Sequence, residues 1–432
     1  MLSLVRNVLN PYDTTRRDAL ARRWRDMPGA LKTETQVIGR YVWGCGATHG
    51  IHERCNFGCT ACYLGKTANH QPPLPFAAVA RQMDVLAENL GAGGNIQITS
   101  GEVTLLPAEE LVRILLYARE KKLVPMVMSH GDVLLHQPDY LDRLITEGRL
   151  TKISIHVDIT QRGRKNYSRV DEEKALNPLR DQMAELLRGA RQRTGRKLKA
   201  ATTMTVNRQN IGQLGDVVHW FLDNADTFRI LSFQPQAETG RTDTGDGVDG
   251  AAVWTALEAA LGMKLTRHPA MFGHPDCTWF NLILMFDFGD KRALLPAVRL
   301  NKAQDQRLMV RLLEALGGVN LNDQKAGVSV GRVLGILLRS PVLLMRTLAY
   351  AVRRSWDERR WIPATIWAAL RLKLRLRPTA FVVHNFMDRE TLDTEVGRER
   401  VAACAFKLPV NGRMVSMCEM NGTELREQTY VV

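Results

Sequence analysis

Three runs of strand length, IQIT at 96–99, VPMVMS at 124–129 and ISIHVDI at 153–159, decide the expected fold. They are rich in apolar residues and suit parallel strands that are covered on both faces. Helical patterns of apolar residues lie between them, so strand and helix alternate along the chain. This alternation predicts an α/β protein with a parallel sheet.

The same alternation extends in both directions. We expect strands at 50–53, 95–99, 125–129, 152–158, 199–206 and 228–234. We expect helices between them at 76–90, 108–121, 138–146, 172–193 and 211–224. Six strands and five helices fit an open or closed barrel or a doubly wound sheet, and the pattern alone does not choose between them.

The rest of the chain suggests further parts. Residues 1–44 predict a basic N-terminal helical extension, and 45–245 contain the alternating strands and helices. A loop at 239–250, rich in Gly, Asp and Thr, marks a boundary. Segments 246–330 and 380–432 contain the remaining distant cysteines and form the expected C-terminal domain, with short strands and turns at its end. Residues 331–379 are an expected insertion of basic amphipathic helices.

The composition is that of a folded protein with an anionic partner. Of 432 residues, 45% are hydrophobic, which excludes disorder over most of the chain, and the net charge is +14. The N-terminal residues predict neither a signal peptide nor a membrane-spanning helix, so we expect a cytoplasmic protein.

Three of the seven cysteines are crowded into the loop His52-Glu-Arg-Cys55-Asn-Phe-Gly-Cys59-Thr-Ala-Cys62-Tyr63. The spacing C-x3-C-x2-C lets three thiolates bind three irons of a [4Fe-4S] cluster, which leaves the fourth iron open to a substrate or cofactor. A zinc site is an alternative, although zinc usually takes four protein ligands in a structural site. Core cysteines that lie close together by coincidence are another.

This loop after a first strand resembles the signature of the radical S-adenosylmethionine (SAM) superfamily. The resemblance implies a partial (β/α)6 barrel of the TIM type, with a C-terminal extension and the basic helical insertion in addition. It implies that the open iron binds the methionine part of SAM and that SAM cleavage yields a 5′-deoxyadenosyl radical. It also implies an electron donor such as ferredoxin or flavodoxin. The residue before the last cysteine, usually aromatic in that family, is Ala61 here.

Two further motifs fit the resemblance. Ser100-Gly101-Glu102 ends the second expected strand and looks like the family's Gly-Gly-Glu motif. Gly101 would let the backbone approach the ligand, and Glu102 would accept a hydrogen bond from the methionine ammonium. Ser129, at the end of the third strand, would bind the ribose. In the fourth strand, Ser154, His156 and Asp158 alternate onto one face.

Cys277, Cys404 and Cys418 lie outside the expected barrel. Many radical SAM enzymes carry an auxiliary cluster in such an extension, so a second [4Fe-4S] cluster is one interpretation. Its fourth ligand would be Cys45, His274 or the substrate. Buried thiols and a zinc site are the alternatives.

The C-terminal residues also resemble the tail of the tetraether-lipid-synthase-like group of radical SAM enzymes. The segments that carry the resemblance are His384-Asn-Phe-Met-Asp388, Cys404, Asn411-Gly-Arg413 and Ser416-Met-Cys418-Glu-Met-Asn421. The resemblance implies radical chemistry on unactivated C–H bonds of an apolar substrate, such as a lipid, by C–C bond formation or methylation. Modification of RNA or of a peptide is an alternative, as is a non-enzymatic Fe–S protein at a membrane.

Between 332 and 377 eleven Lys and Arg residues stand against Asp357 and Glu358, a net charge of +9. Arginines recur every seven residues from Arg332 to Arg360, which on one helix would form a stripe. With Trp356, Trp361 and Trp367 nearby, the stretch predicts a helix on an anionic membrane surface at its inner face. A helical subdomain with a solvated basic face and a nucleic-acid surface are the alternatives, and the latter lacks interleaved aromatic residues.

Overall fold

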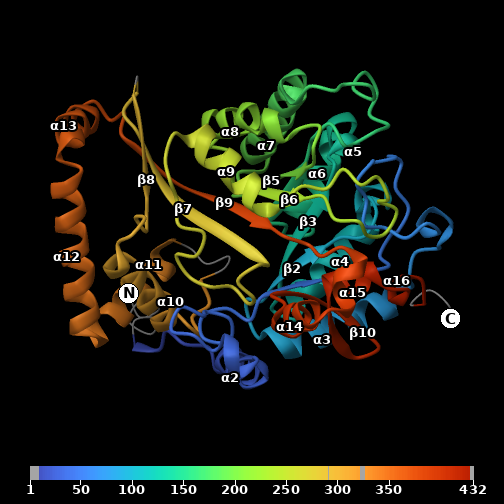
Figure 1. Ribbon diagram of the computed structural model, residues 1–432, viewed down its shortest axis with the longest axis horizontal. Helices are drawn as coiled ribbons and strands as arrows, with labels where there is room; N and C mark the ends of the chain where they lie inside the picture. The colour runs from blue at the N-terminus through green and yellow to red at the C-terminus, as the bar shows by residue number, and fades with distance from the viewer. Residues whose placement is uncertain (1–8, 290, 322–325, 429–432) are drawn as a thin grey trace.

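The computed structural model describes residues 9–289, 291–321 and 326–428. In these residues, eleven strands form one sheet in the order β11-β10-β1-β2-β3-β4-β5-β6-β9-β7-β8. The sheet curls and stays open, with helices packed along it (Figure 1). The expected partial barrel is therefore confirmed.

Six successive parallel strands form the centre of the sheet. They are β1 (Cys45–Ala47), β2 (Asn95–Ile98), β3 (Val124–Ser129), β4 (Lys152–His156), β5 (Lys199–Val206) and β6 (Phe228–Pro235). The helices between them are α3 (Phe76–Leu90), α4 (Ala108–Glu120), α5 (Asp132–His136), α6 (Pro138–Thr146), α7 (Asn177–Thr194) and α8 (Leu214–Asp223). Their apolar faces and the strands share one large core.

The expected first strand was wrong. Residues 50–53 form a loop, and β1 lies earlier, at Cys45–Ala47. The chain turns at Gly50, whose φ of +69° ends any extended run. β1 is only three residues long, yet it pairs with β2 and with β10, so its place comes from pairing on both sides.

C-terminal strands extend the sheet at both edges. β9 (Arg375–His384) pairs in parallel with β6, followed by the antiparallel strands β7 (Thr278–Asp287) and β8 (Arg292–Pro296). At the other edge, β10 (Phe406–Val410) pairs in parallel with β1 and carries β11 (Arg413–Ser416). The segments assigned to a separate C-terminal domain thus share the sheet of the barrel.

The remaining helices lie around this sheet. They are α2 (Thr14–Asp26), α9 (Gly250–Leu261), α10 (Ala303–Ala315), α11 (Ala326–Arg339), α12 (Pro341–Asp357), α13 (Ile362–Leu370), α14 (Glu395–Ala403), α15 (Met417–Gly422) and α16 (Leu425–Gln428). Helices α14 to α16 correct the expectation of only strands and turns after residue 380. They lie on the opposite side of the molecule from α12 and α13 (Figure 1).

Candidate active site

One cavity lies at the carboxyl ends of the parallel strands, the edge where such sheets carry their chemistry. The three cysteines of the loop after β1 line it, together with residues 100–102 after β2 and Ser129 at the end of β3. The C-terminal part of the chain contributes Phe386, Met387, Phe406, Met417, Cys418 and Asn421 to its lining. Residues of both motifs and one distant cysteine therefore face the same space.

The thiols of Cys55, Cys59 and Cys62 are partly buried. Burial, with the charges of Glu102 and Cys62, raises the pKa of Cys55 to about 11, and burial beside the other two thiols raises the pKa of Cys59. Three thiolates gathered here therefore require a positive centre. Arg241 supplies one donor, from Nη2 to Cys62 Sγ at 3.4 Å.

The donor set of this loop fits a [4Fe-4S] cluster, which takes one thiolate per iron. Within the described ranges, no group of three or more His, Cys, Asp or Glu side chains is arranged to hold a metal ion as it stands. The Cys62 amide donates to Thr242 Oγ1 at 2.7 Å and the Cys55 amide to Asn69 Oδ1 at 3.0 Å. Backbone contacts therefore fix the loop independently of its thiols.

Gly101 holds the cysteine loop against the second strand. Its amide donates to His52 O and the Glu102 amide to Arg54 O, each at 2.9 Å. A Cβ at position 101 would lie 2.3 Å from Glu53 O and 2.4 Å from Arg54 O. The sequence predicted that Gly101 lets the backbone approach the ligand. In the structure, the close approach at Gly101 is to the backbone of the cysteine loop.

Ser100 is part of a buried polar cluster. Its Oγ donates to Glu53 Oε1 at 2.7 Å, and Arg426 Nη1 donates to the same oxygen at 3.0 Å. Arg426 also donates to Asn421 Oδ1, and its guanidinium lies 5.3 Å from the Tyr63 ring centre. Helix α16 is thereby tied to the cysteine loop through one carboxylate.

Glu102 is aimed by several donors. Ser129 Oγ donates to its Oε1 at 2.8 Å, and the His130 amide donates to its Oε2 at 2.9 Å. The Thr104 amide also donates to Oε1, at 3.1 Å. The side chain is buried, at 1% exposure, and lines the cavity. Such a preorganised carboxylate can accept an ammonium group in a charge-assisted hydrogen bond. Ser129, expected at the ribose, is here bonded to Glu102.

His130 packs the two motifs together. Its ring stacks on Phe57 of the cysteine loop with a centroid distance of 3.8 Å, and its Nε2 lies 2.9 Å from Asn56 Oδ1. Burial lowers the pKa of His130, which favours the neutral ring. The guanidinium of Arg164 lies 4.9 Å from the centre of the Phe57 ring and donates to His130 O at 2.8 Å.

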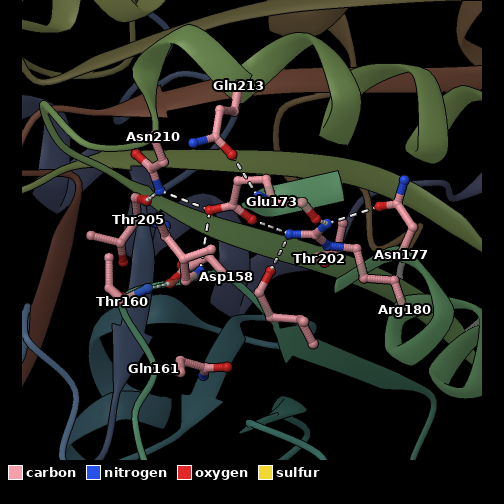
Figure 2. A network of polar contacts seen from close by, with 12 residues as sticks. Asp158, Thr160, Gln161, Glu173, Asn177, Arg180, Thr202, Thr205, Asn210 and Gln213 are labelled. Atoms are coloured by element: carbon pink, nitrogen blue, oxygen red, sulfur yellow. Dashed lines mark hydrogen bonds and ion pairs between the residues drawn. The ribbon is translucent and has the colours of Figure 1, made fainter. Parts of the chain in front are cut away.

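Ser154 and His156 of β4 line the cavity, and Asp158 lies behind them. Asp158 accepts hydrogen bonds from the His156 ring, from Thr160 and from the Thr205 amide; although burial opposes it, they hold its pKa below the usual range. Figure 2 shows this carboxylate next to a buried network in which Glu173 contacts Arg180 and Asn210.

Cys277 comes near Cys404 and Cys418 in the fold, since the charges of Cys404 and Cys277 both act on Cys418. Burial, with the charges of Cys404 and Cys277, raises the pKa of Cys418 to about 12. Arg400 Nε donates to Cys277 Sγ at 3.4 Å, and the Met387 amide donates to Cys418 Sγ at the same distance. Of the three, Cys418 reaches the cavity wall.

The two protein groups considered as a fourth ligand have other neighbours. The thiol of Cys45 lies near Lys152, whose charge acts against the effect of burial on its pKa. His274 lies between Asp276 and Glu399, at 3.8 and 3.7 Å from their carboxylate oxygens.

Part of the chain is similar to known proteins. Residues 51–221 match the family model of the radical SAM superfamily. The chain is 23% identical over 230 residues to 7,8-dihydro-6-hydroxymethylpterin dimethyltransferase of Methanocaldococcus jannaschii. The aligned segment covers 50% of this chain and 44% of that protein.

Solved structures resemble the fold only loosely. SuiB of Streptococcus suis bound to precursor peptide SuiA is 15% identical, with a TM-score of 0.38 over 52% of this chain and 47% of its own. Coproporphyrinogen III oxidase of Escherichia coli, a radical SAM enzyme, is 14% identical, with a TM-score of 0.30 over 57% and 54%. The chain spans about half the length of these proteins. The segment 51–221 that matches the radical SAM superfamily model contains both the cysteine loop and residues 100–102.

Proposed function

We propose that the protein cleaves SAM at a [4Fe-4S] cluster held by Cys55, Cys59 and Cys62. The radical formed by this cleavage activates a C–H bond of an apolar substrate. When bound, the cluster and SAM supply a 5′-deoxyadenosyl radical as the hydrogen-abstracting group. The observation that carries the proposal is that the three thiols and the buried carboxylate of Glu102 line one cavity.

The residues that line the cavity have different proposed roles. Glu102, aimed by Ser129 and the His130 amide, accepts the methionine ammonium of SAM. Ser100 and Gly101 hold the cysteine loop against the second strand, and Ser129 keeps Glu102 in place beside the ribose position. A ferredoxin or flavodoxin supplies the electron.

The cavity lining supports this choice of substrate class. Phe386, Met387, Phe406 and Met417 contribute apolar side chains to the lining. These side chains favour an apolar substrate, such as a lipid, over RNA, whose recognition requires cationic contacts. The likeness of 230 residues of the chain to a pterin dimethyltransferase supports methylation as the reaction.

We further propose a second [4Fe-4S] cluster on Cys277, Cys404 and Cys418. Besides burial, the charge of Cys404 raises the pKa of both Cys277 and Cys418, and Cys418 lines the cavity. Substrate in the cavity is then the natural candidate for a fourth ligand.

Electron paramagnetic resonance of the reduced, reconstituted protein tests the first cluster. Addition of SAM should change the spectrum of the wild type, because SAM binds the open iron. The same addition should not change the spectrum of a Cys59→Ser variant. A spectrum that SAM does not alter would contradict the proposal.

Iron and sulfide counts test the second cluster. We expect about eight irons in the wild type and about four in a Cys277→Ala, Cys404→Ala, Cys418→Ala variant. Equal counts would refute a second cluster and would leave the first cluster unaffected.

Comparison of cellular lipids with and without the gene tests the substrate class, and an unchanged lipid profile would favour RNA or peptide as substrate.

A further inference from the structure

Helices α11, α12 and α13 present apolar side chains to solvent. On α12, Val342, Met345, Val352 and Trp356 are each 62–71% exposed. At 100° per residue these positions fall on one side of the helix. Leu338 of α11 and Leu370 of α13 are 57% and 81% exposed and continue the apolar surface. This many exposed apolar side chains on adjacent helices mark a binding surface.

The opposite side of α12 is held by the protein. Leu343 and Arg354 are buried there. Tyr350 donates from its hydroxyl to Ala297 O at 2.6 Å, and Arg353 Nη2 lies 3.3 Å from Asp305 Oδ1. The helix is therefore fixed in orientation, and its apolar side faces outward.

Basic residues border the apolar side. Arg346 and Arg360 are exposed, whereas the two acids of the segment are engaged, Asp357 with Arg299 and Glu358 with Arg360. The expected single stripe of arginines is wrong, since α11 and α12 are bent by 110° and Arg353 turns to Asp305. Arg371 stacks on Trp367 at 4.0 Å, a combination typical of membrane interfaces.

The lengths of these helices favour attachment to a membrane surface over a membrane span. No single helix among the described residues is long and apolar enough to cross a bilayer, and only the bent pair 327–339 and 341–357 reaches that length and composition together. A second copy of the chain would bring two segments of net charge +9 against each other. A bilayer with anionic lipid offers apolar depth and negative charge at once.

We propose that α11, α12 and α13 form a docking surface for a bilayer that contains anionic lipid. Outer side chains of α12 enter the interface, and Arg346 and Arg360 meet the headgroups. The surface lies at the start of β9, near Arg375, whereas the cavity lies near its end, past His384 (Figure 1). Ten extended residues separate the two by about 30 Å. Docking therefore anchors the enzyme whether or not its substrate is a lipid.

Flotation of the reconstituted full chain with vesicles tests the proposal. We expect binding to phosphatidylcholine vesicles that contain phosphatidylglycerol, and weak binding to phosphatidylcholine alone. Met345→Glu with Val352→Glu should abolish flotation. Leu116→Glu on α4, 39% exposed, is the control and should float like the wild type. Unchanged SAM cleavage by each variant shows that it is folded.

Two double variants test whether vesicle binding requires the positive charge of this surface. Arg346→Gln with Arg360→Gln should weaken vesicle binding about 30-fold, since each cation near an anionic surface contributes about a factor of six. Lys197→Gln with Arg208→Gln removes the same charge elsewhere and should change little.

Several results would overturn the proposal. These are no flotation of the wild type, equal flotation of the two glutamate variants, or retention of the protein in vesicles after alkaline carbonate extraction, which marks a spanning segment. A dimer that the glutamate variants dissociate without vesicles would assign the surface to a second copy instead.

Discussion

At the residue scale, Gly101 decides whether the cysteine loop can lie against the sheet. Two backbone hydrogen bonds and the absence of a Cβ bring residues 52–54 next to it. Any side chain at 101 would displace carbonyls that position the loop. The spacing of the three thiols therefore depends on a residue outside the cysteine loop.

We predict that Gly101→Ala lowers the iron content after reconstitution and costs about 1–3 kcal/mol of unfolding free energy, as overpacking does. Gly58→Ala is the matched control, since it lies in the same loop and a Cβ there has no neighbour within 4 Å. Iron analysis and urea unfolding measure both. Equal iron content in the two variants would contradict this role.

Arg426 is a positioning residue at the same scale. It shares Glu53 with Ser100 across 373 residues of chain. Arg426→Leu should lower the free energy of unfolding by about 3–5 kcal/mol, because it leaves a buried carboxylate without its cation. It should also weaken SAM binding measured by titration.

The double variant Glu53→Gln, Arg426→Leu separates the two effects. Removal of the carboxylate charge should restore much of the stability lost in Arg426→Leu. A double variant less stable than the single one would show that the pair does not act as described.

At the element scale, the buried pair of Arg180 and Glu173 ties the start of α7 to the loop after β4 (Figure 2), because the Ile159 amide donates to Glu173 Oε1 at 3.2 Å. Arg180 also donates to Val157 O at 3.1 Å. The loop that follows β4 is thereby fixed, and its Asp158 contacts His156, which lines the cavity.

Arg180→Met should lower the free energy of unfolding by about 3–5 kcal/mol, as the loss of one partner of a buried pair does. Arg188→Met is the control on the same helix. Arg188 pairs with Asp226, but both side chains are more than a third exposed, so the expected loss is about 0–1 kcal/mol. Similar losses in both variants, measured by urea unfolding, would argue against a structural role for the network.

Elements with local patterns could be predicted from the sequence, and those that depend on distant partners could not. Strands β2 to β6 begin and end within two residues of their predicted bounds, because long apolar runs identify them. β1 was misplaced, since Cys45-Gly-Ala47 has little strand propensity and its neighbours β2 and β10 determine it. No local signal shows that β9 inserts between β6 and β7.

The site divides in the same way. The cysteine loop and residues 100–102 are contiguous motifs, so the spacing alone identifies them as candidates. Arg241, Thr242 and Arg426 reach the loop only through folding, from 179 or more residues away. A polar loop at 239–250 was visible in the sequence, but it indicated a boundary and not a contact with Cys62.

At the scale of the whole molecule, buried histidines determine the response to acid. Burial lowers the pKa of His49, His52, His130, His268, His274 and His384, the last to about 4. These rings stay neutral in the fold and take up protons once unfolded. Between about pH 6.5 and 4 the unfolded state therefore binds more protons.

Stability should be fully present above pH 6.5 and fall as the pH decreases toward 4. Each histidine contributes at most about 1.4 kcal/mol per pH unit over its own range. Urea unfolding of cluster-free protein at several pH values measures the slope, and His384→Phe should reduce it. A midpoint that does not change between pH 7 and pH 5 would contradict this prediction.

The central claim is that the loop of Cys55, Cys59 and Cys62 supports reductive cleavage of SAM in the cavity that also contains Glu102. The most direct test is 5′-deoxyadenosine formation by the anaerobically reconstituted protein with a strong reductant. We expect 5′-deoxyadenosine from the wild type and none from a variant with all three cysteines replaced by alanine. Absence of 5′-deoxyadenosine from a wild type that contains its iron and sulfide would contradict SAM cleavage at this loop.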